Sequence, residues 1–442
     1  MVPAGSSRSE VADAKGNLKI IEFGKNLGIG GIERAMQEFA IGLHNMGHKV
    51  IVCVLDDSGP RKVILENYGI KVIKLQGNSN DIISGDNQIS ARHHDLKQLT
   101  KIVKKFKADI VHSHAWRIKE YCGDAYFVQE VVFANSYSPE ADANIIISNA
   151  LALKLSGIYN LGEKDIVIGY PQNVANWDKI RGKMLGVPKD SFVIGRLGRA
   201  EPSKTDFLLL QSAPRIARKI KNVHFIFVGL PLLYRKILGL YPVLNGKITF
   251  LEESSEDEDL AKFYETIDVL WHTASWGETF GNVIAEAMTF GKPVVTHSTP
   301  FKGGKLAERM DNSQIELVDH LVTGLVANYP NDVVEAMYIL ASDPQLVREF
   351  GQAGRQKVEE KYSSEVVIRQ FLSFLENKTW QRPDFRDDYN YRLGNSVNHS
   401  SKSHKRIYLM KKKMYLWFLE SPYLIIRYIL RERFKYNIEV QS

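Results

Sequence analysis

Apolar, strand-like runs alternate with helix-like stretches along most of the chain, and this alternation restricts the fold more than any other feature. Lys19–Phe23 and Lys49–Leu55 have the composition of strands, and Ile32–Asn45 between them repeats apolar residues at helical spacing. Strand, helix and strand in this order form the parallel β-α-β unit of α/β domains. Further strands are predicted in the first half of the chain at Ile70–Leu75, Asp109–Ser113 and Asn144–Ser148.

The alternation restarts after Pro171–Lys183, where Gly, Pro and Asn cluster. Strands are then predicted at Phe192–Leu197, Val223–Val228, Lys247–Leu251, Val269–His272, Pro293–Thr296 and Ile315–Val318. Helices are predicted at Asp206–Ile220, Asn282–Phe290, Pro344–Tyr362 and Ser364–Asn377. Because 442 residues are many for one core, the restart predicts two Rossmann-like, doubly wound α/β domains that face each other across a cleft.

Composition excludes several classes of protein. Hydrophobic residues make up 44% of the chain and charged residues 25%, which is ordinary for a globular protein. Cys53 and Cys122 are the only cysteines, so we expect neither a disulfide framework nor a multi-cysteine metal cluster, and a reducing cytosolic location fits. Residues 1–17 are polar and small, which predicts disorder rather than a signal peptide. No apolar run approaches the roughly 18 residues that a spanning helix requires.

The positive charge lies at the C-terminal end. The net charge of the chain is +7, and residues 402–442 hold ten basic and three acidic residues, so residues 1–401 balance to zero. Aromatic residues such as Tyr415 and Trp417 stand among the basic ones. Such segments bind anionic membranes as interfacial helices, and nucleic acid or an acidic protein are the alternative partners. We expect the membrane surface, and no binding of nucleic acid.

The string Glu-Thr-Phe-Gly-Asn-Val-Ile-Ala-Glu places two carboxylates eight positions apart, at Glu278 and Glu286. The Phe-Gly-Asn turn between them is predicted to begin a helix, whose first N–H groups and dipole favour an anion. The pattern indicates a phosphorylated, hydroxyl-rich ligand held between the two carboxylates. The alternative is that Glu278 is an N-terminal helix charge and Glu286 a solvated helix residue.

Glycines follow the first predicted strand in Gly28-Ile-Gly-Gly-Ile-Glu-Arg34, where they allow the backbone to approach a ligand closely. A dinucleotide fingerprint requires a third glycine where Glu33 stands, so an NAD site with Asp56 and Asp57 is a weak alternative. A plain glycine turn is the structural alternative. The sequence has no Gly-Lys-Ser/Thr and therefore no P-loop.

A His-x-His at His112 and His114 ends a predicted strand, and residues two apart on a strand share a face. A metal site would need a third ligand, and none is near in sequence. We interpret His112 as a hydrogen-bonded histidine at the end of the sheet.

In the second half, Arg199 and Lys204 put two cations into a strand–loop–helix connection that can neutralise a pyrophosphate. Arg196 is a second candidate for this role.

Asp257-Glu258-Asp259 matches the Asp-x-Asp pattern of metal-dependent sugar transfer. We instead interpret these residues as acidic residues in a first helical turn, with Ser254 and Ser255 as candidate N-caps. No metal site is therefore predicted.

Four of these strings together resemble the retaining glycosyltransferases of family 4, which have the GT-B fold and transfer a sugar from a nucleotide diphosphate to an acceptor. They are Gly-Gly-Ile-Glu-Arg at 30–34, His-Ser-His at 112–114, Gly-Arg-x4-Lys at 198–204 and the Glu-x7-Glu pair at 278–286. They occur in the family's order within residues 18–377. Thr205 departs from the pattern, because the family usually has Gly there.

The resemblance implies the roles of the matching residues. Arg199 and Lys204, with the Gly30-Gly31 loop, would stabilise the leaving diphosphate, so no metal or other cofactor is required. Glu286 would hold the donor's ribose, Glu278 the sugar hydroxyls, and His114 would contact the transferring sugar. The predicted catalytic residues are His114, Arg199, Lys204 and Glu278, and the predicted donor-binding residues are Gly30, Gly31, Arg199, Lys204, Glu278, Phe280, Gly281, Asn282 and Glu286.

The resemblance also implies a division of the chain and a set of partners. We expect a disordered N-terminus at 1–17, an acceptor domain at 18–178, a donor domain at 179–362, a helix at 363–378 that returns to the first domain, and a basic, aromatic tail at 379–442. The expected partners are a nucleotide-sugar donor, a glycan or lipid-linked acceptor, and an anionic membrane bound through residues 402–442. The expected location is cytoplasmic, peripheral on the inner face of the membrane.

Other activities are compatible with the same fold and motifs. A sugar-nucleotide epimerase would work without an acceptor, and a glycan phosphorylase would consume inorganic phosphate. A non-catalytic, membrane-bound assembly partner would not bind a donor. The four intact motifs favour a metal-independent glycosyltransferase of the hexosyltransferase type.

Overall fold

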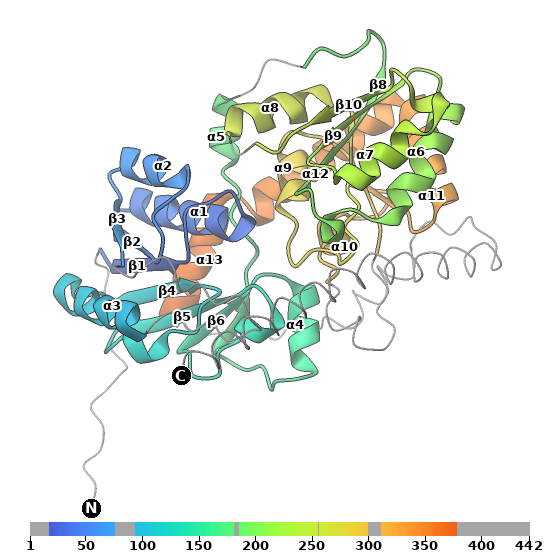
Figure 1. The fold of residues 1–442 in the computed structure, drawn as a ribbon. Helices are drawn as coiled ribbons and strands as arrows, with labels where there is room; N and C mark the ends of the chain where they lie inside the picture. Colours follow the sequence, from blue (N-terminus) through green and yellow to red (C-terminus); the bar gives the residue numbers. More distant parts are fainter. Residues whose placement is uncertain (1–16, 76–92, 181–184, 255, 299–310, 378–442) are drawn as a thin grey trace, which may run out of the picture.

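The computed structural model describes residues 17–75, 93–180, 185–254, 256–298 and 311–377. Two sheets with flanking helices form two lobes, one from each half of the chain (Figure 1). The expected disordered N-terminus lies almost entirely outside the described residues, and the expected tail at 379–442 lies wholly outside them. Within the described part, no helix has both the length and the apolar character needed to cross a bilayer.

The first lobe contains seven parallel strands in the order β3-β2-β1-β4-β5-β6-β7. The strands are β1 Lys19–Gly24, β2 Lys49–Val54, β3 Lys71–Lys74, β4 Ile110–His114, β5 Tyr126–Val131, β6 Ala143–Ile146 and β7 Asp165–Val167. The helices are α1 Gly31–Asn45, α2 Arg61–Asn67, α3 His93–Phe106 and α4 Asn149–Ser156, with short 3-10 turns η2 Lys119–Tyr121 and η3 Ala134–Ser136. Helix α5, Val174–Lys179, lies in the connection that follows and packs on the second lobe, since the centroids of the Trp177 and Phe290 rings lie 5.3 Å apart (Figure 1).

The second lobe contains six parallel strands in the order β10-β9-β8-β11-β12-β13. The strands are β8 Phe192–Leu197, β9 Val223–Val228, β10 Ile248–Leu251, β11 Val269–Trp271, β12 Val294–Thr296 and β13 Gly324–Val326. The helices are α6 Phe207–Lys219, α7 Leu232–Gly239, α8 Asp257–Thr266, α9 Asn282–Thr289, α10 Gln314–Leu317, α11 Pro330–Ser342 and α12 Pro344–Lys361, with turns η4 Pro202–Lys204 and η5 Pro242–Leu244.

Strand order reverses once in each sheet, between β1 and β4 in the first and between β8 and β11 in the second. Loops that leave two strands in opposite directions open a crevice at such a point, and open α/β sheets bind ligands there. One of the four sequence motifs, His-Ser-His, ends strand β4 beside the first of these points. The other three lie in the loops that follow β1, β8 and β11, or at the start of the next helix. The topology therefore brings the motifs to the carboxyl edges of the two sheets.

Most predicted strands are confirmed, but the strand predicted at Ile315–Val318 is wrong. These residues belong to α10, in which the Leu317 N–H donates to the Ser313 carbonyl oxygen at 3.0 Å. The last strand is instead β13, which pairs with β12. A short apolar run with one acidic residue fits a strand and a buried helical turn equally well, so periodicity alone does not distinguish them.

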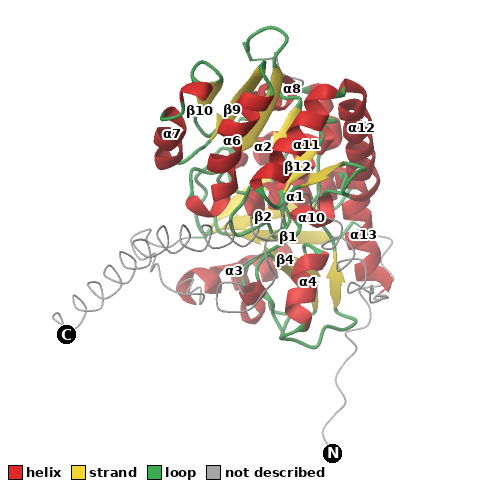
Figure 2. Cartoon of the chain, turned by 90° about the vertical axis from the view of Figure 1, so that its right-hand side faces the viewer, coloured by secondary structure: helices red, strands yellow, loops and turns green. Residues whose placement is uncertain are grey.

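Helix α13, Ser364–Asn377, packs on the first lobe although it follows the second in sequence (Figures 1 and 2). The ring centroids of Phe371 and Phe39 lie 5.6 Å apart, and the Ile368 side chain packs against Gly42 of α1. The two crossings between the lobes run side by side, since the Gln172 N–H donates to the Tyr362 carbonyl and the Ser364 N–H donates to the Gln172 carbonyl. Two segments of the chain, hydrogen-bonded to each other, thus connect the lobes.

Candidate active site

The Glu278 carboxylate lies between a cation and a histidine. Lys204 donates from Nζ to Glu278 Oε2 at 2.6 Å, and His272 Nε2 lies 3.1 Å from Glu278 Oε1. Burial raises the pKa of Glu278, but the charge of Lys204 and the contact with His272 outweigh it and bring the pKa to about 2. The carboxylate is therefore ionised throughout the physiological range, and the alternative that Glu278 is only an N-terminal helix charge does not account for its contacts with Lys204 and His272.

The loop that carries Glu278 is held by α10, the helix that the sequence analysis missed. The Gln314 side chain accepts from the Glu278 N–H at 3.0 Å, and the Ser313 N–H donates to the Glu278 carbonyl at 2.9 Å. Gly281 ends the loop with φ of 108°, a conformation that residues with a side chain rarely adopt, and it is the N-cap of α9. Phe280 is buried against the Tyr170 and Tyr362 rings.

Arg196 and Arg199 have different roles, although both lie near the predicted diphosphate loop. Arg199 has a side chain 56% exposed and pairs with Glu201 at 2.8 Å. Arg196 is buried and donates to the carbonyl oxygens of the loop at 198–205 and of the β9 end. Arg196 therefore shapes the loop, whereas Arg199 remains available to a ligand.

Thr205, which stands where the family usually has glycine, belongs to the same arrangement. Its Oγ1 accepts from Arg196 Nη2 at 2.7 Å, and its carbonyl accepts from Tyr234 and Ser275. The departure from the family pattern thus comes with its own supporting contacts, and Lys204 beside it keeps its position facing Glu278.

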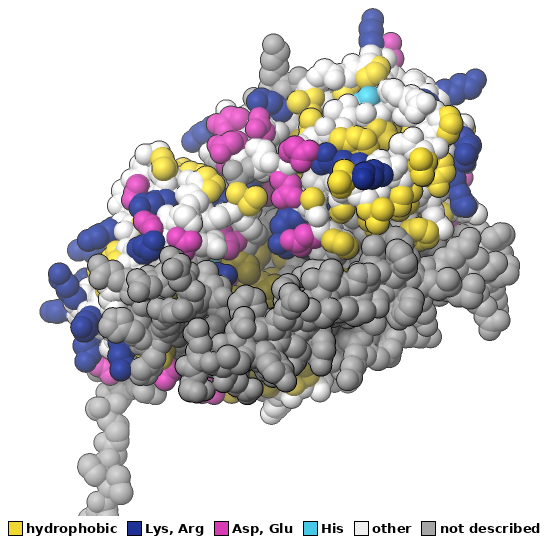
Figure 3. Space-filling model, in the orientation of Figure 1, with side chains coloured by type: hydrophobic (Ala, Val, Ile, Leu, Met, Phe, Trp, Pro, Cys, Tyr) yellow, Lys and Arg dark blue, Asp and Glu magenta, His cyan; other side chains and the backbone are white. Residues whose placement is uncertain are grey.

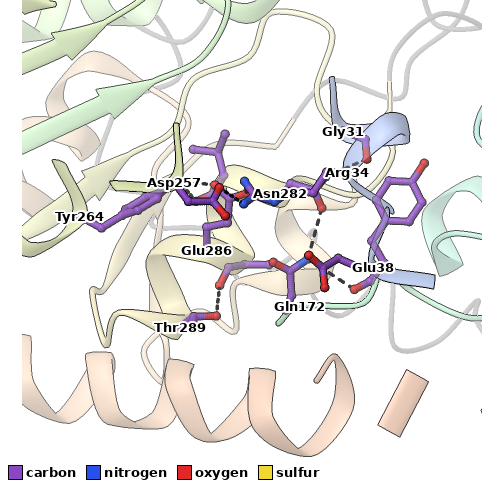
Figure 4. A network of polar contacts seen from close by, with 12 residues as sticks. Gly31, Arg34, Glu38, Gln172, Asp257, Tyr264, Asn282, Glu286 and Thr289 are labelled. Atoms are coloured by element: carbon purple, nitrogen blue, oxygen red, sulfur yellow. Dashed lines mark hydrogen bonds and ion pairs between the residues drawn. The ribbon is translucent and has the colours of Figure 1, made fainter. Parts of the chain in front are cut away.

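Glu286 lies in a network that joins the two lobes (Figure 4). Arg34 on α1 donates to Glu286 Oε1 at 3.1 Å and also pairs with Asp257, the first residue of α8. Tyr264 donates its hydroxyl to Glu286 Oε2 at 2.7 Å. Burial raises the pKa of Glu286, and the charge of Arg34 opposes that rise. The solvated-residue alternative for Glu286 is wrong, because the side chain is buried.

Arg34, to which the sequence analysis gave no role, is a central member of this network. Its guanidinium is buried, and its Cζ lies 4.8 Å from the centroid of the Trp177 ring in the connection between the lobes. Figure 3 shows acidic and basic side chains mixed where the lobes face each other. A guanidinium that meets two carboxylates and one indole fixes the position of the first helix against the second lobe.

The glycine loop also touches the second lobe. Asn282 donates from Nδ2 to the Gly31 carbonyl at 3.4 Å and accepts from Gln172 Nε2 at 3.3 Å. A Cβ added to Gly31 would lie 2.8 Å from Asn282 Nδ2, which is too close for an ordinary contact. A side chain at position 31 would therefore displace the Asn282 amide from its contact with the Gly31 carbonyl, while Gly30 is the N-cap of α1.

His114 is completely buried between two carboxylates. Its Nδ1 lies 2.9 Å from Glu130 Oε2 and its Nε2 lies 2.6 Å from Glu22 Oε2. Burial lowers the pKa of His114, but the two carboxylates outweigh it and raise the pKa to about 10. Both ring nitrogens then carry protons. The residue lines a hollow beside α1, but both of its nitrogens already have partners in the protein.

His112 packs its ring against Phe39 and Phe371 at centroid distances of 4.9 and 5.2 Å. Its Nδ1 lies 2.9 Å from Glu22 Oε2. Burial raises the pKa of Glu22, but this contact lowers it and fits the predicted hydrogen-bonded role, whereas Nε2 has no hydrogen-bond partner within the described residues. The prediction overlooked Glu22 and Glu130. Each is an acidic residue inside an otherwise apolar strand, and that was the available signal.

Glu22, His112 and His114 bring three possible metal ligands within 4.8 Å of one another. Ligands bound to zinc at about 2.0–2.2 Å in a tetrahedron lie roughly 3.3 Å apart. The 2.6 Å between Glu22 Oε2 and His114 Nε2 is shorter than that and matches a charged hydrogen bond. The geometry favours a proton over a metal ion in this cluster.

Asp257 and Asp259 lie in the first turn of α8, as the sequence analysis interpreted them. Asp259 pairs with Lys262 at 2.8 Å, and Asp257 pairs with Arg34. The predicted serine N-cap is wrong, since the N-cap is Glu256 and has no capping side-chain bond. Ser254 contributes differently, because its Oγ accepts from the Glu256 N–H at 3.2 Å. Ser255 lies outside the described residues.

Two family models match the chain, Glycosyltransferase Family 4 over residues 29–123 and Glycosyl transferases group 1 over residues 179–357. Among solved structures, HepE from Anabaena in complex with UDP and glucose is 19% identical with a TM-score of 0.63, over 82% of this chain and all of that one. Together with the two doubly wound lobes, these matches identify the GT-B fold. The chain belongs to glycosyltransferase family 4.

Curated relatives include the human alpha-1,3/1,6-mannosyltransferase ALG2, which is 26% identical over 49% of this chain and 53% of its own length. The capsular polysaccharide biosynthesis glycosyltransferase CapM of Staphylococcus aureus is 27% identical over 44% of this chain and 49% of its own length. The match therefore spans about half the length of these relatives.

Proposed function

We propose that the chain is a metal-independent glycosyltransferase of the hexosyltransferase type. It transfers a sugar from a nucleotide-diphosphate sugar to a glycan or lipid-linked acceptor and retains the anomeric configuration. The observation that carries the proposal is the contact between Lys204 and Glu278 beside the N-terminus of α9. A cation, a carboxylate and helix N–H groups meet there, which are the groups that a phosphate and sugar hydroxyls require. The relatives ALG2, a mannosyltransferase, and CapM, a glycosyltransferase of capsular polysaccharide biosynthesis, support the same reaction class.

Donor binding would exchange one ion pair for another. The diphosphate competes with Glu278 for the Lys204 ammonium, and Glu278 keeps its contact with His272 while it accepts hydrogen bonds from the sugar. Arg199 reaches the diphosphate from its exposed position. The bond from the anomeric carbon to the phosphate oxygen breaks, the acceptor oxygen forms the new bond, and its proton passes to the departing diphosphate. Lys204 and Arg199 stabilise the charge that develops there, without a metal.

Glu286 would bind the ribose without losing its partners. A carboxylate offers about four lone-pair sites, and Arg34 and Tyr264 use two of those on Glu286. The remaining sites suit the two ribose hydroxyls. Phe280, Gly281 and Asn282 bring backbone groups to the sugar, and Gly30 and Gly31 do so to the diphosphate. On this proposal residues 18–178 bind the acceptor and residues 179–362 bind the donor.

Nucleotide binding tests this function directly. A ligand that binds only the folded protein raises its apparent stability, by about 2.7 kcal/mol at a concentration one hundred times the dissociation constant. We expect at least one of the diphosphates of uridine, guanosine, adenosine, cytidine and thymidine to raise the melting temperature of the full chain. The matching nucleotide sugar should release its diphosphate faster when acceptor glycans are added. No shift with any of the five, or release that no acceptor changes, would refute the transferase.

A membrane role is proposed separately for the tail at 402–442, from its ten basic residues. Each basic residue near an anionic surface contributes about 1 kcal/mol, and salt screens the attraction over about 8 Å at physiological ionic strength. Full-length protein should sediment with phosphatidylserine vesicles, less so in high salt, while a chain truncated after Asn377 should not sediment and should keep its donor affinity. Equal sedimentation of both, or a preference for RNA at matched salt, would contradict the membrane role and the peripheral location on the inner face.

A further inference from the structure

A hollow lies at the carboxyl edge of the first sheet, beside the point where its strand order reverses. The residues after β1, the first turn of α1 and the end of β4 line it, with His114 among them. Apart from His114, to which the family resemblance gives a contact with the transferring sugar, none of the side chains that form its walls takes part in the donor contacts proposed above. Two observations on those walls, and a third on the groups behind them, describe the hollow.

The first observation is an aromatic wall at Trp116. Its ring lines the hollow and lies edge-on to Phe23, with 6.4 Å between the ring centroids. Ala115 before it has φ of 73°, a left-handed conformation that residues other than glycine rarely adopt, and the Ser113 hydroxyl donates to the Trp116 carbonyl at 2.6 Å. Strained backbone of this kind concentrates at binding sites. Ile32 and Met36 extend the apolar wall.

The second observation is a carboxylate without a partner. Glu33 stands in the first turn of α1 and lines the hollow, partly exposed. Within the described residues its carboxylate has no hydrogen-bond or ion-pair partner. It lies near the Gly30 backbone, where an added Cβ would come within 2.2 Å of Glu33 Oε2. A side chain at position 30 would displace the Glu33 carboxylate, and the glycine leaves room for it.

The third observation is that polar groups nearby also lack partners. The Tyr170 hydroxyl and Glu130 Oε1 are buried and make no hydrogen bond within the described residues. Burial, and then the charges of Glu130 and Glu33, raise the pKa of Tyr170 well above its usual value, so its hydroxyl stays protonated. Native proteins pair nearly all such groups. Neither residue is among those that line the hollow, so these two groups belong to the polar interior behind His114 and Glu33. The Tyr170 ring also packs on Phe280 of the donor loop, at 5.3 Å.

We propose that this hollow binds a neutral pyranose ring of the acceptor, with the apolar face of the ring on Trp116 and its hydroxyl edge toward Glu33. An aromatic ring and a carboxylate that line one hollow match the two kinds of surface on a sugar ring, one of C–H groups and one of hydroxyls. The inference rests on the proposed function, because it names the acceptor of that reaction. Glu33 binds and orients the hydroxyl, and the departing diphosphate still takes the proton.

The test uses p-nitrophenyl pyranosides of glucose, galactose, mannose and N-acetylglucosamine as probes of the full chain. Binding is measured by saturation-transfer NMR and titration calorimetry. At least one pyranoside should bind, and Trp116→Ala and Glu33→Ala should each weaken it tenfold or more. Trp116→Phe should retain most of the affinity, because it keeps an aromatic face. Glu66→Gln, an exposed carboxylate on α2, is the matched control and should change nothing.

Binding of none of the four pyranosides, or equal binding by both alanine variants and the parent chain, would overturn the inference. The melting shift with nucleotide diphosphate should persist in Trp116→Ala and Glu33→Ala, and its loss in both would also overturn it, because the acceptor and donor subsites would not be separate. If the parent chain shows that shift and binds no pyranoside, the transferase proposal stands and only the acceptor inference fails.

Discussion

The two lobes contribute charged groups to the cleft in different ways. In the first lobe, Glu22, His114 and Glu130 form a fully buried chain of charges that solvent does not reach. In the second, Lys204 and Glu278 form a single ion pair with side chains 27% and 15% exposed. In the first arrangement both nitrogens of His114 are bonded to protein carboxylates, although its ring borders the hollow beside α1, whereas the second arrangement opens toward the cleft.

This difference separates fixed charges from exchangeable ones. Removing one member of a buried group leaves an uncompensated charge, so such a group determines stability more than it responds to ligands. The Lys204–Glu278 pair also stabilises the fold, since it lowers the pKa of Glu278 against the effect of burial, but it opens toward the cleft, so a ligand phosphate can replace one of its partners. We therefore expect variants of the first lobe's cluster to unfold the protein and variants of the second lobe's pair to impair turnover.

The largest expected effect follows the change His114→Ala. It leaves Glu22 and Glu130 buried without their shared cation, which should lower the free energy of unfolding by about 3–5 kcal/mol. Native-state hydrogen exchange at the amides of β4 and β5 measures this locally in the full chain. His44→Ala, a partly exposed histidine on α1, should change exchange little. Similar exchange in both variants would remove the distinction between the lobes.

The second effect is catalytic and concerns Lys204→Ala and Arg199→Ala. Each should lower turnover by about 100-fold or more, the scale for loss of a donor that stabilises transition-state charge. The melting temperature should change little in Arg199→Ala, whose side chain is 56% exposed, and should fall in Lys204→Ala, which leaves the Glu278 carboxylate without its cation. Lys219→Ala, whose lysine pairs with Glu335 on the surface, is the control with a similar ion pair. Near-normal turnover in the Arg199 and Lys204 double variant would end the diphosphate assignment.

The third effect is the dependence of stability on pH. The pKa of His114 is raised to about 10 in the folded protein, so its contribution is complete below about pH 6.5 and is lost as the pH rises toward 10. The pKa values of Glu278 and Glu22 are lowered to about 2, so their contributions are complete above about pH 4.5 and are lost as the pH falls toward 2.

Urea midpoints across this pH range separate the two lobes. His114→Gln should remove the loss of stability between pH 6.5 and 10. Glu278→Gln should leave that loss at high pH unchanged and should reduce the loss of stability at low pH. The slope from one group is at most about 1.4 kcal/mol per pH unit. If the His114→Gln variant still loses stability between pH 6.5 and 10, the imidazole of His114 is not the charged group of the cluster.

The fold was predictable from the sequence because periodicity and turn residues agree along most strands. Strand β5 was missed, since Gln129 and Glu130 interrupt its apolar run, and their burial depends on contacts from β4 and from residues far apart in sequence. Strand β7 has only three residues, too few to show a period. The α10 error has the opposite cause, an apolar run that fits either structure.

The candidate site was predictable only as a set of motifs. The positions of Glu278, Lys204 and Arg199 follow from their loops, but the pairing of Lys204 with Glu278 is a contact across 74 positions. Arg34 lay within a recognised string, yet its partners Asp257 and Glu286 belong to the other lobe. The burial of His114 depends on Glu22 from a neighbouring strand, and pairing between strands cannot be read from spacing along one of them.

The smallest expected effect is that of a chelator, and it applies to both lobes. Excess EDTA should leave turnover unchanged, because Lys204 and Arg199 supply the charge that a metal would otherwise supply. It should also leave the melting temperature unchanged, because Glu22 and His114 lie at hydrogen-bond distance, closer than two ligands of one zinc ion. A fall in melting temperature that zinc reverses would make the first lobe's cluster a metal site. A loss of turnover alone, restored by manganese or magnesium, would instead assign the metal to Asp257 and Asp259 of the second.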